Sequence, residues 1–179
     1  MLKKIVFLGT GGTIAGRAAH ATDNVGYKAA QVGVAQLMQD IPGLLHLGAG
    51  YDLVSEQVCQ VDSKDMGWSH WRTLALRIHD SLVEPEVHAV VVTHGTDTLE
   101  ETAFFLSQVL QPALLAAKAV VLTCAMRPSS SSSPDGPQNV LDAVAVARLE
   151  SSHGVLVVCA GTIHCARDCL LYTSDAADE

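Results

Sequence analysis

The sequence has no run of lysine or arginine and no long hydrophobic stretch. Eleven Lys and Arg against 19 Asp and Glu give its 179 residues a formal charge of −8. Because nucleic acids and anionic membranes are bound by clustered cations, we expect neither as a partner. The apolar runs are far shorter than a membrane span, and the run before Gly9 is too short for the core of a signal peptide. We therefore expect a soluble, cytoplasmic protein.

Closely spaced metal ligands are also missing. No CxxC pair occurs, and no spacing of histidine and cysteine matches a zinc site. The five cysteines are scattered along the chain, at Cys59, Cys124, Cys159, Cys165 and Cys169. We expect no disulfide and no metal. The first three of these cysteines lie in apolar runs and are predicted to be small buried hydrophobic residues.

Apolar runs alternate along the chain with segments of helical period. The runs predict five buried strands, at residues 4–8, 53–61, 87–92, 119–124 and 155–159. The periodic segments predict helices at residues 31–41, 66–83, 98–110 and 140–149. The helix at 66–83 carries an apolar face made of Trp68, Trp71, Leu74, Ile78 and Leu82. Strands that are apolar throughout and alternate with amphipathic helices indicate a three-layer α/β domain, with a mostly parallel sheet and helices on both faces.

In such a sheet, ligands bind at the carboxyl ends of the strands. The segments that follow the first three predicted strands are GTGGTIAG, VDSKD and THGTDT. Together they offer three hydroxyls and a carboxylate, from Thr13, Ser63, Thr96 and Asp97. A threonine hydroxyl is a poor nucleophile at neutral pH and needs a neighbouring base or cation. The sequence therefore predicts a polar pocket, and raises the question of which group would make a hydroxyl reactive.

Each segment taken alone also has a plain structural interpretation. GTGGTIAG lacks the third glycine of the dinucleotide fingerprint and the lysine of a P-loop, so it is either an ordinary turn or a place where backbone N–H groups converge on an oxyanion. Thr98 with Glu101 fits a helix capping box. Ser63 fits the N-cap of a helix that begins near Met66.

The combination resembles the bacterial-type L-asparaginases. The matching motifs are LGTGGTIAG, GYKAAQVGV, VDSKDM, VVTHGTDTLEETAFFL, AMRPSSSSSPDGPQN and GVLVVCAGTIHCARD, in the order and at the spacing of that family. They cover about residues 3–168. The resemblance implies a homotetrameric amidohydrolase without a cofactor, which hydrolyses asparagine to aspartate and ammonia and often has some glutaminase activity.

The resemblance also implies a role for individual residues. Thr13 would be the nucleophile that attacks the side-chain amide carbon of the substrate. Tyr27, in the loop that follows, would hydrogen-bond to Thr13 and help to activate it. Ser63 would bind the α-carboxylate of the substrate, and Gly12 and Lys64 would line the substrate site.

One expected group is missing. By the resemblance, Asp97 would hold the α-ammonium group, and Thr96 would act with Asp97 and a lysine as a second catalytic group. In the family this lysine lies three residues beyond an Arg-Asp pair. That pair corresponds here to Arg167 and Asp168, and the lysine position holds Leu171. We therefore expect this chain to be inactive or impaired as an asparaginase.

The family pattern stops after Asp168. We expect residues 1–168 to form an asparaginase-like N-terminal α/β domain and residues 169–179 to be a foreign tail from a sequencing or assembly junction. The C-terminal domain of the family is expected to be absent. Two alternatives remain open: a non-catalytic α/β module that binds an acidic amino acid, and the amidase subunit of a tRNA-dependent amidotransferase, against which the acidic charge weighs.

Overall fold

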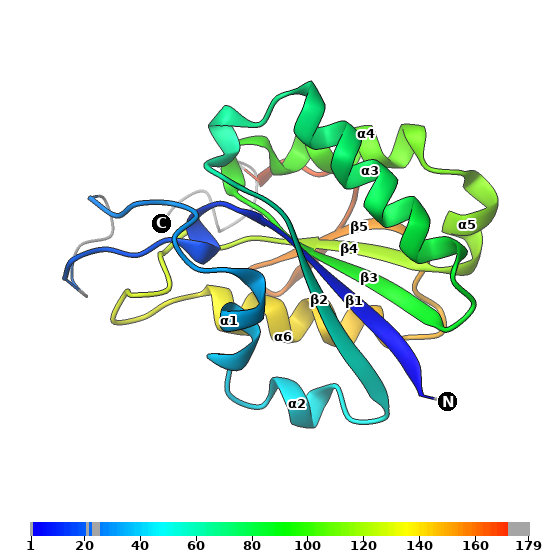
Figure 1. Ribbon diagram of the computed structural model, residues 1–179, viewed down its shortest axis with the longest axis horizontal. Helices are drawn as coiled ribbons and strands as arrows, with labels where there is room; N and C mark the ends of the chain where they lie inside the picture. The colour runs from blue at the N-terminus through cyan, green and yellow to red at the C-terminus, as the bar shows by residue number, and fades with distance from the viewer. Residues whose placement is uncertain (1, 21, 23–25, 172–179) are drawn as a thin grey trace.

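A six-stranded sheet forms the centre of the molecule (Figure 1). The computed structural model describes residues 2–20, 22 and 26–171. The strands are β1 (Lys3–Gly11), β2 (Tyr51–Val61), β3 (Val87–Thr93), β4 (Ala119–Thr123), β5 (Gly154–Cys159) and β6 (Thr162–Cys165). They lie in the order β2-β1-β3-β4-β5-β6. Neighbouring strands are parallel except β6, which runs antiparallel to β5.

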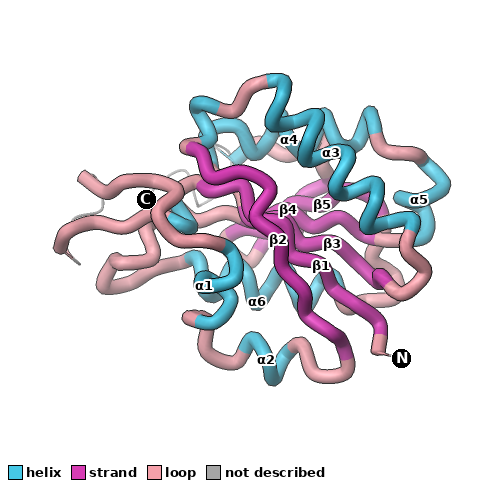
Figure 2. Tube along the Cα trace, in the orientation of Figure 1, coloured by secondary structure: helices cyan, strands magenta, loops and turns pink. Residues whose placement is uncertain are grey.

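Within the described residues, six α-helices cover the two faces of this sheet. They are α1 (Val34–Gln39), α2 (Leu44–Leu47), α3 (Trp68–Val83), α4 (Leu99–Val109), α5 (Pro112–Ala117) and α6 (Gly136–Ala147). Figures 1 and 2 show α3, α4 and α5 on one face and α1, α2 and α6 on the other. The predicted three-layer α/β fold with a mostly parallel sheet is confirmed.

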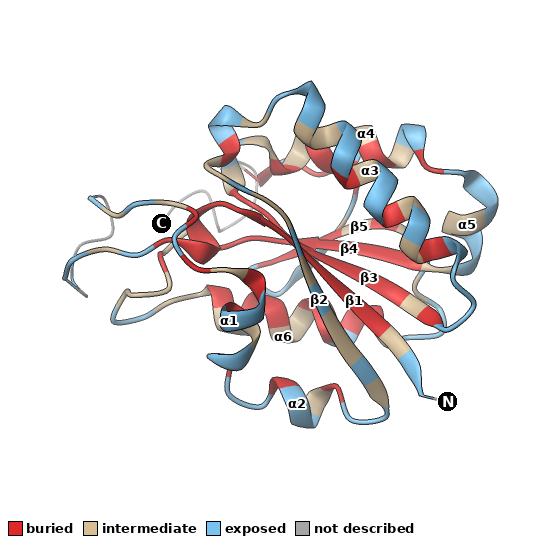
Figure 3. Ribbon diagram, viewed as in Figure 1, coloured by how far each residue is buried: buried red, intermediate tan, exposed pale blue. Residues whose placement is uncertain are grey.

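The central strands show why an unbroken apolar run predicts a strand here. In β3, Val90 and Val92 belong to the apolar cluster that includes residues of α3 and α4, whereas Ala89 and Val91 belong to the cluster that includes residues of α1 and α6. Successive side chains of a strand point to opposite faces, so a strand covered on both sides is apolar at every position. Figure 3 shows β3 and β4 as the buried centre of the sheet, with the more exposed β2 at one edge.

All five predicted strands and four predicted helices are present, with shifted ends. The predicted helix 31–41 is confined to α1, and the predicted helix 140–149 is α6, which starts earlier because Pro137 suits its first turn. The short elements α2, α5 and β6 were not predicted. The predicted inward position of Trp68 is wrong, because this first residue of α3 is 67% exposed and its ring packs edge-on against Phe105, at 5.5 Å.

The end of the described chain packs on the core. Cys169 and Leu171 are buried in the same apolar cluster as α3 and α4. Residues 172–179, most of the expected foreign tail, lie outside the described residues, so the boundary after Asp168 stays a prediction. In the part of the chain that the structure describes, no helix is both long and apolar enough to cross a bilayer.

A candidate active site at the carboxyl ends of the strands

The loops that follow β1 and β3 touch through two glycines. Gly12 has φ +76°, and a Cβ there would lie 2.3 Å from the Cα of Gly95. A Cβ on Gly95 would in turn lie 2.4 Å from Oγ of Ser63, in the loop after β2. Only residues without a side chain allow backbones to approach this closely. The contact brings together the three loops that carry Thr13, Ser63 and Thr96–Asp97.

The Thr13 hydroxyl lies against a phenol. Thr13 begins a single 3-10 turn, Thr13–Ala15, and its side chain is largely buried. Its Oγ1 is 2.6 Å from the Tyr27 hydroxyl, and either oxygen can be the donor. Tyr27 is held there by its neighbour Lys28, which exchanges two backbone hydrogen bonds of 2.9 Å with Arg17. The pair orients the threonine oxygen.

Ser63 joins the loops after β2 and β3. Its buried Oγ accepts the backbone N–H of Asp97 at 3.1 Å, and its carbonyl accepts the hydroxyl of Thr98 at 2.9 Å. The predicted N-cap position of Thr98 is confirmed, but its capping-box hydrogen bond is not formed, and the predicted N-cap role of Ser63 is wrong. Thr98 is the N-cap of α4, but its hydroxyl bonds to Ser63 instead of the helix backbone. The N-cap of α3 is Gly67, whose N–H donates to Nδ1 of His70 at 3.1 Å.

Asp97 and Thr96 stand at the rim of the site, in the 3-10 turn Thr96–Thr98. Asp97 is exposed and Thr96 is half-buried. Lys64 is close to them, but its ammonium group forms an ion pair of 2.9 Å with Asp62. The hydrogen bond to Asp62 raises the pKa of Lys64, and the charges of Asp62, Asp65 and Asp97 add to it. Lys64 therefore keeps its proton.

A buried histidine that the sequence analysis did not single out fixes the loop after β3. Nε2 of His94 lies 3.0 Å from Oγ1 of Thr102, which accepts the indole N–H of Trp71 at 2.8 Å. Because a carbonyl oxygen can only accept, Nδ1–H donates to the Gly95 carbonyl at 2.8 Å, and Nε2 of the neutral ring accepts the Thr102 hydroxyl. Burial lowers the pKa of His94 to about 4, so the ring is neutral at pH 7.

This histidine predicts a loss of stability in mild acid. The pKa of His94 falls from 6.5 in the unfolded chain to about 4 in the folded protein. As the pH falls, His94 therefore binds a proton in the unfolded chain before it does so in the folded protein. The contribution of His94 to the free energy of unfolding is complete above pH 6.5 and is lost as the pH falls towards 4. The expected loss between pH 7.5 and pH 5 is about 2 kcal/mol. Urea unfolding at both pH values measures it. His94→Gln should remove most of this pH dependence, and an equal dependence in both proteins would refute the assignment.

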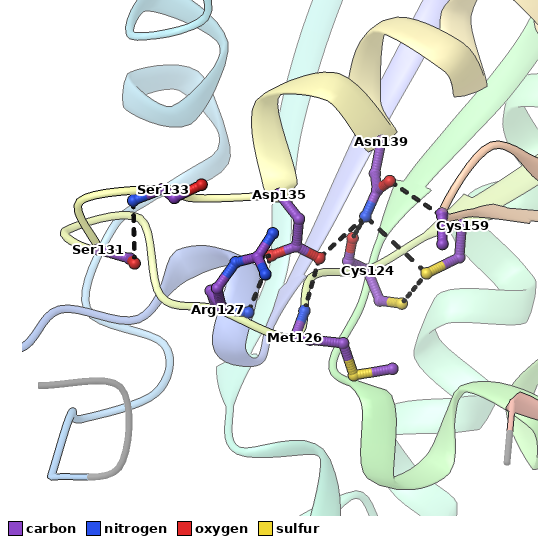
Figure 4. Close-up of polar contacts among 9 residues, drawn as sticks. Cys124, Met126, Arg127, Ser131, Ser133, Asp135, Asn139 and Cys159 are labelled. Carbon is purple, nitrogen blue, oxygen red and sulfur yellow. Dashed lines mark hydrogen bonds and ion pairs between the residues drawn. The ribbon is translucent and has the colours of Figure 1, made fainter. Parts of the chain in front are cut away.

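The loop after β4 completes the same edge of the sheet (Figure 4). The carboxylate of Asp135 accepts the backbone N–H groups of Met126 at 2.8 Å and Arg127 at 2.9 Å. The hydroxyl of Ser129 donates to the carbonyl of Gly16 at 2.7 Å. The serine-rich segment is therefore tied to the loop that carries Thr13.

The position expected to hold a lysine lies beside the start of α4. Leu171 is buried in the apolar cluster, and its backbone N–H donates to the carboxylate of Glu100. Glu100 belongs to the first turn of α4, directly after Thr96–Thr98. The chain thus passes close to Thr96 and Asp97. The side chain at the position expected to hold a lysine is the apolar one of Leu171.

Known proteins are similar to this chain both in sequence and in fold. Residues 4–179 match the family model described as Asparaginase, N-terminal. The chain is 40% identical over 166 residues to a glutaminase-asparaginase of Acinetobacter glutaminasificans, covering 92% of this chain and 48% of the relative. It is 40% identical over 169 residues to L-asparaginase 2 of Escherichia coli K12, covering 93% and 46%.

A solved structure is similar along almost the whole chain. It is the crystal structure of a probable cytoplasmic L-asparaginase from Campylobacter jejuni, with 37% identity and a TM-score of 0.89, covering 97% of this chain and 52% of that one. This chain spans about half the length of the curated relatives it matches.

Proposed function

This chain belongs to the asparaginase family, and from that premise we propose that its site is built to hydrolyse L-asparagine to L-aspartate and ammonia, with Thr13 as the nucleophile. The observation that carries the proposal is the 2.6 Å contact between the Thr13 and Tyr27 hydroxyls, on a turn that packs against the Thr96–Asp97 loop. The relatives named glutaminase-asparaginase support glutamine as a second substrate. The acidic charge of this chain weighs against the tRNA-dependent amidotransferase alternative.

In this reaction the Thr13 oxygen bonds to the amide carbon and loses its proton. The carbonyl oxygen becomes an oxyanion, and ammonia leaves after gaining a proton. Water then cleaves the resulting ester and frees Thr13. Tyr27 orients the attacking oxygen. The N–H of Gly12 already donates to the carbonyl of Val61 at 3.0 Å, so Gly12 contributes close packing at the substrate site, and another donor must stabilise the oxyanion.

The rest of the site suits a free amino acid. The exposed carboxylate of Asp97 pairs with an α-ammonium group. The Ser63 oxygen accepts a hydrogen bond from the Asp97 backbone, which leaves its own proton to donate to an α-carboxylate. Lys64 adds a positive charge at the same rim, partly neutralised by Asp62. These assignments predict that aspartate, the product, binds competitively with asparagine.

We further propose that the chain as it stands has little or no activity. The second catalytic group contains Thr96 and Asp97 and requires a lysine, whereas the resemblance places Leu171 at that position. A leucine side chain cannot accept or release a proton. We propose that a chain with a lysine at position 171, joined to the part of the family sequence that this chain does not span, would be active.

The test compares two proteins in an ammonia-release assay with asparagine. One is this chain, and the other is a chimera that joins residues 1–168 to the part of E. coli L-asparaginase 2 beyond its match to Asp168. We expect turnover only in the chimera. The matched control changes the lysine that takes position 171 in the chimera to leucine, which should abolish turnover. If neither protein hydrolyses asparagine but both bind aspartate tightly, the site belongs to a non-catalytic amino-acid-binding module.

A further inference from the structure

Two cysteines lie side by side where β4 and β5 end. The parallel strands are in register up to the pair Thr123 and Val158, and the next residues of the two strands are Cys124 and Cys159. Their Sγ atoms are 3.4 Å apart, and both side chains are fully shielded from solvent (Figure 4). Neither thiol has a part in the proposed hydrolysis.

The register puts these two residues within the range of a disulfide. Neighbouring strands lie about 4.8 Å apart. A disulfide requires a Cα separation of roughly 4.4–6.8 Å and a sulfur–sulfur bond of about 2.0 Å. The two sulfurs would therefore have to approach each other by little more than about 1 Å, which side-chain rotation and a small movement of one strand end can supply.

The surroundings make the two sulfurs chemically different. The thiol of Cys124 donates to Sγ of Cys159. The side-chain N–H₂ of Asn139 lies 3.8 Å from the same Sγ and donates to the Cys124 carbonyl at 3.0 Å. These donors favour a thiolate at Cys159, and the hydrogen bond from Cys124 lowers the pKa of Cys159. The same hydrogen bond, together with burial, raises the pKa of Cys124.

We propose that Cys124 and Cys159 form a peroxide-sensitive dithiol, which closes to a reversible disulfide between the ends of β4 and β5. The Cys159 thiolate attacks a hydroperoxide and breaks its O–O bond; Cys159 becomes a sulfenic acid, and the leaving alkoxide or hydroxide takes up the proton that the Cys159 thiol released. The Cys124 sulfur then bonds to the Cys159 sulfur and displaces hydroxide, which takes the Cys124 proton. With hydrogen peroxide, two thiols and one peroxide give one disulfide and two waters.

Access to the pair runs through the turn that follows β5. Ala160 and Gly161 are exposed, and Ala160 has φ 50°, a conformation that costs a residue with a side chain about 1–2 kcal/mol. The N–H of Ala160 donates to Oδ1 of Asn139 at 3.1 Å, the same side chain that contacts both cysteines. A local opening of this strained turn exposes Cys159 without unfolding the sheet. The reaction should therefore be slower than oxidation of the exposed Cys165.

The experiment uses the whole chain with the other three cysteines replaced, Cys59→Ser, Cys165→Ser and Cys169→Ala. Folding is checked by circular dichroism. After treatment with hydrogen peroxide, the intact mass should fall by two hydrogen atoms, and no thiol should be titratable after denaturation. Tryptic digestion should yield a peptide that links Cys124 to Cys159, and dithiothreitol should reverse all three changes.

The matched control adds Cys124→Ser to the same background. It should gain oxygen at Cys159 and form no intramolecular link. The linked peptide is also sought in the unsubstituted chain, so the result does not depend on how the variant folds. The proposal is overturned if the folded unsubstituted chain keeps both thiols, or if Cys159 proceeds to sulfinic acid without linking to Cys124. None of these readouts uses asparagine hydrolysis, so the outcome is independent of the proposed activity.

Discussion

Replacing Thr13 by valine in the chimera is expected to lower kcat for asparagine hydrolysis by on the order of a thousandfold or more, as removal of a nucleophile does in other hydrolases. Valine keeps the branched shape of threonine and removes only the hydroxyl that lies 2.6 Å from Tyr27. Binding of aspartate should change little, because the groups proposed to bind its charged ends belong to other loops. Ammonia release and aspartate titration measure the two effects separately.

Thr10→Val is the matched control for this prediction. Thr10 also lies near the end of β1 and is buried, but its hydroxyl donates to the carbonyl of Thr93 at 3.1 Å. Loss of that hydrogen bond should cost about 1 kcal/mol of stability and leave kcat nearly unchanged. If Thr13→Val retains turnover similar to that of Thr10→Val, Thr13 is not the nucleophile.

Gly12→Ala is expected to cost at least about 3 kcal/mol of stability and to abolish aspartate binding. A methyl group at Gly12 would lie 2.3 Å from one backbone atom of Gly95 and 2.4 Å from another. Backbone cannot rotate away as the end of a flexible side chain can, so the loops after β1 and β3 must separate. Urea unfolding and calorimetric titration with aspartate, both on this chain, measure the two losses.

Gly43→Ala separates crowding from backbone strain. Gly43 has φ +81°, close to the value at Gly12, but a Cβ there would meet no atom within 4 Å. Its substitution should cost only the strain of a left-handed conformation, about 1–2 kcal/mol. Equal losses at the two positions would mean that the Gly12–Gly95 contact has no special importance.

The general plan of the fold follows from local patterns in the sequence. β3 and β4 are apolar at nearly every position because helices cover both faces, and such runs are visible without a structure. The meeting of the loops that carry Thr13, Ser63 and Asp97 follows from the rule that parallel strands end at one edge. β6 escaped prediction because it has only four residues, and three of them are exposed.

Details of the site could not be predicted where hydrogen bonds join distant segments. Thr98 has the sequence context of a helix cap, yet its hydroxyl bonds to Ser63, 35 positions away. The partners of His94 are Thr102, one turn into α4, and through it Trp71 on α3. Which hydrogen-bond partner such a side chain takes depends on which polar groups the fold brings within reach. Helix and strand propensities read along the sequence do not contain that information.

The glycine contact also limits how the proposed site could change its substrate preference. Gly12 and Gly95 meet backbone to backbone, so the spacing between the loops that carry Thr13 and Asp97, the proposed nucleophile and the proposed ammonium-binding residue, is set without any adjustable side chain. Asparagine and glutamine differ by one methylene group along that same line. A shift in preference must therefore come from residues that line the space between the two loops, because the loops themselves cannot slide apart to admit the longer molecule.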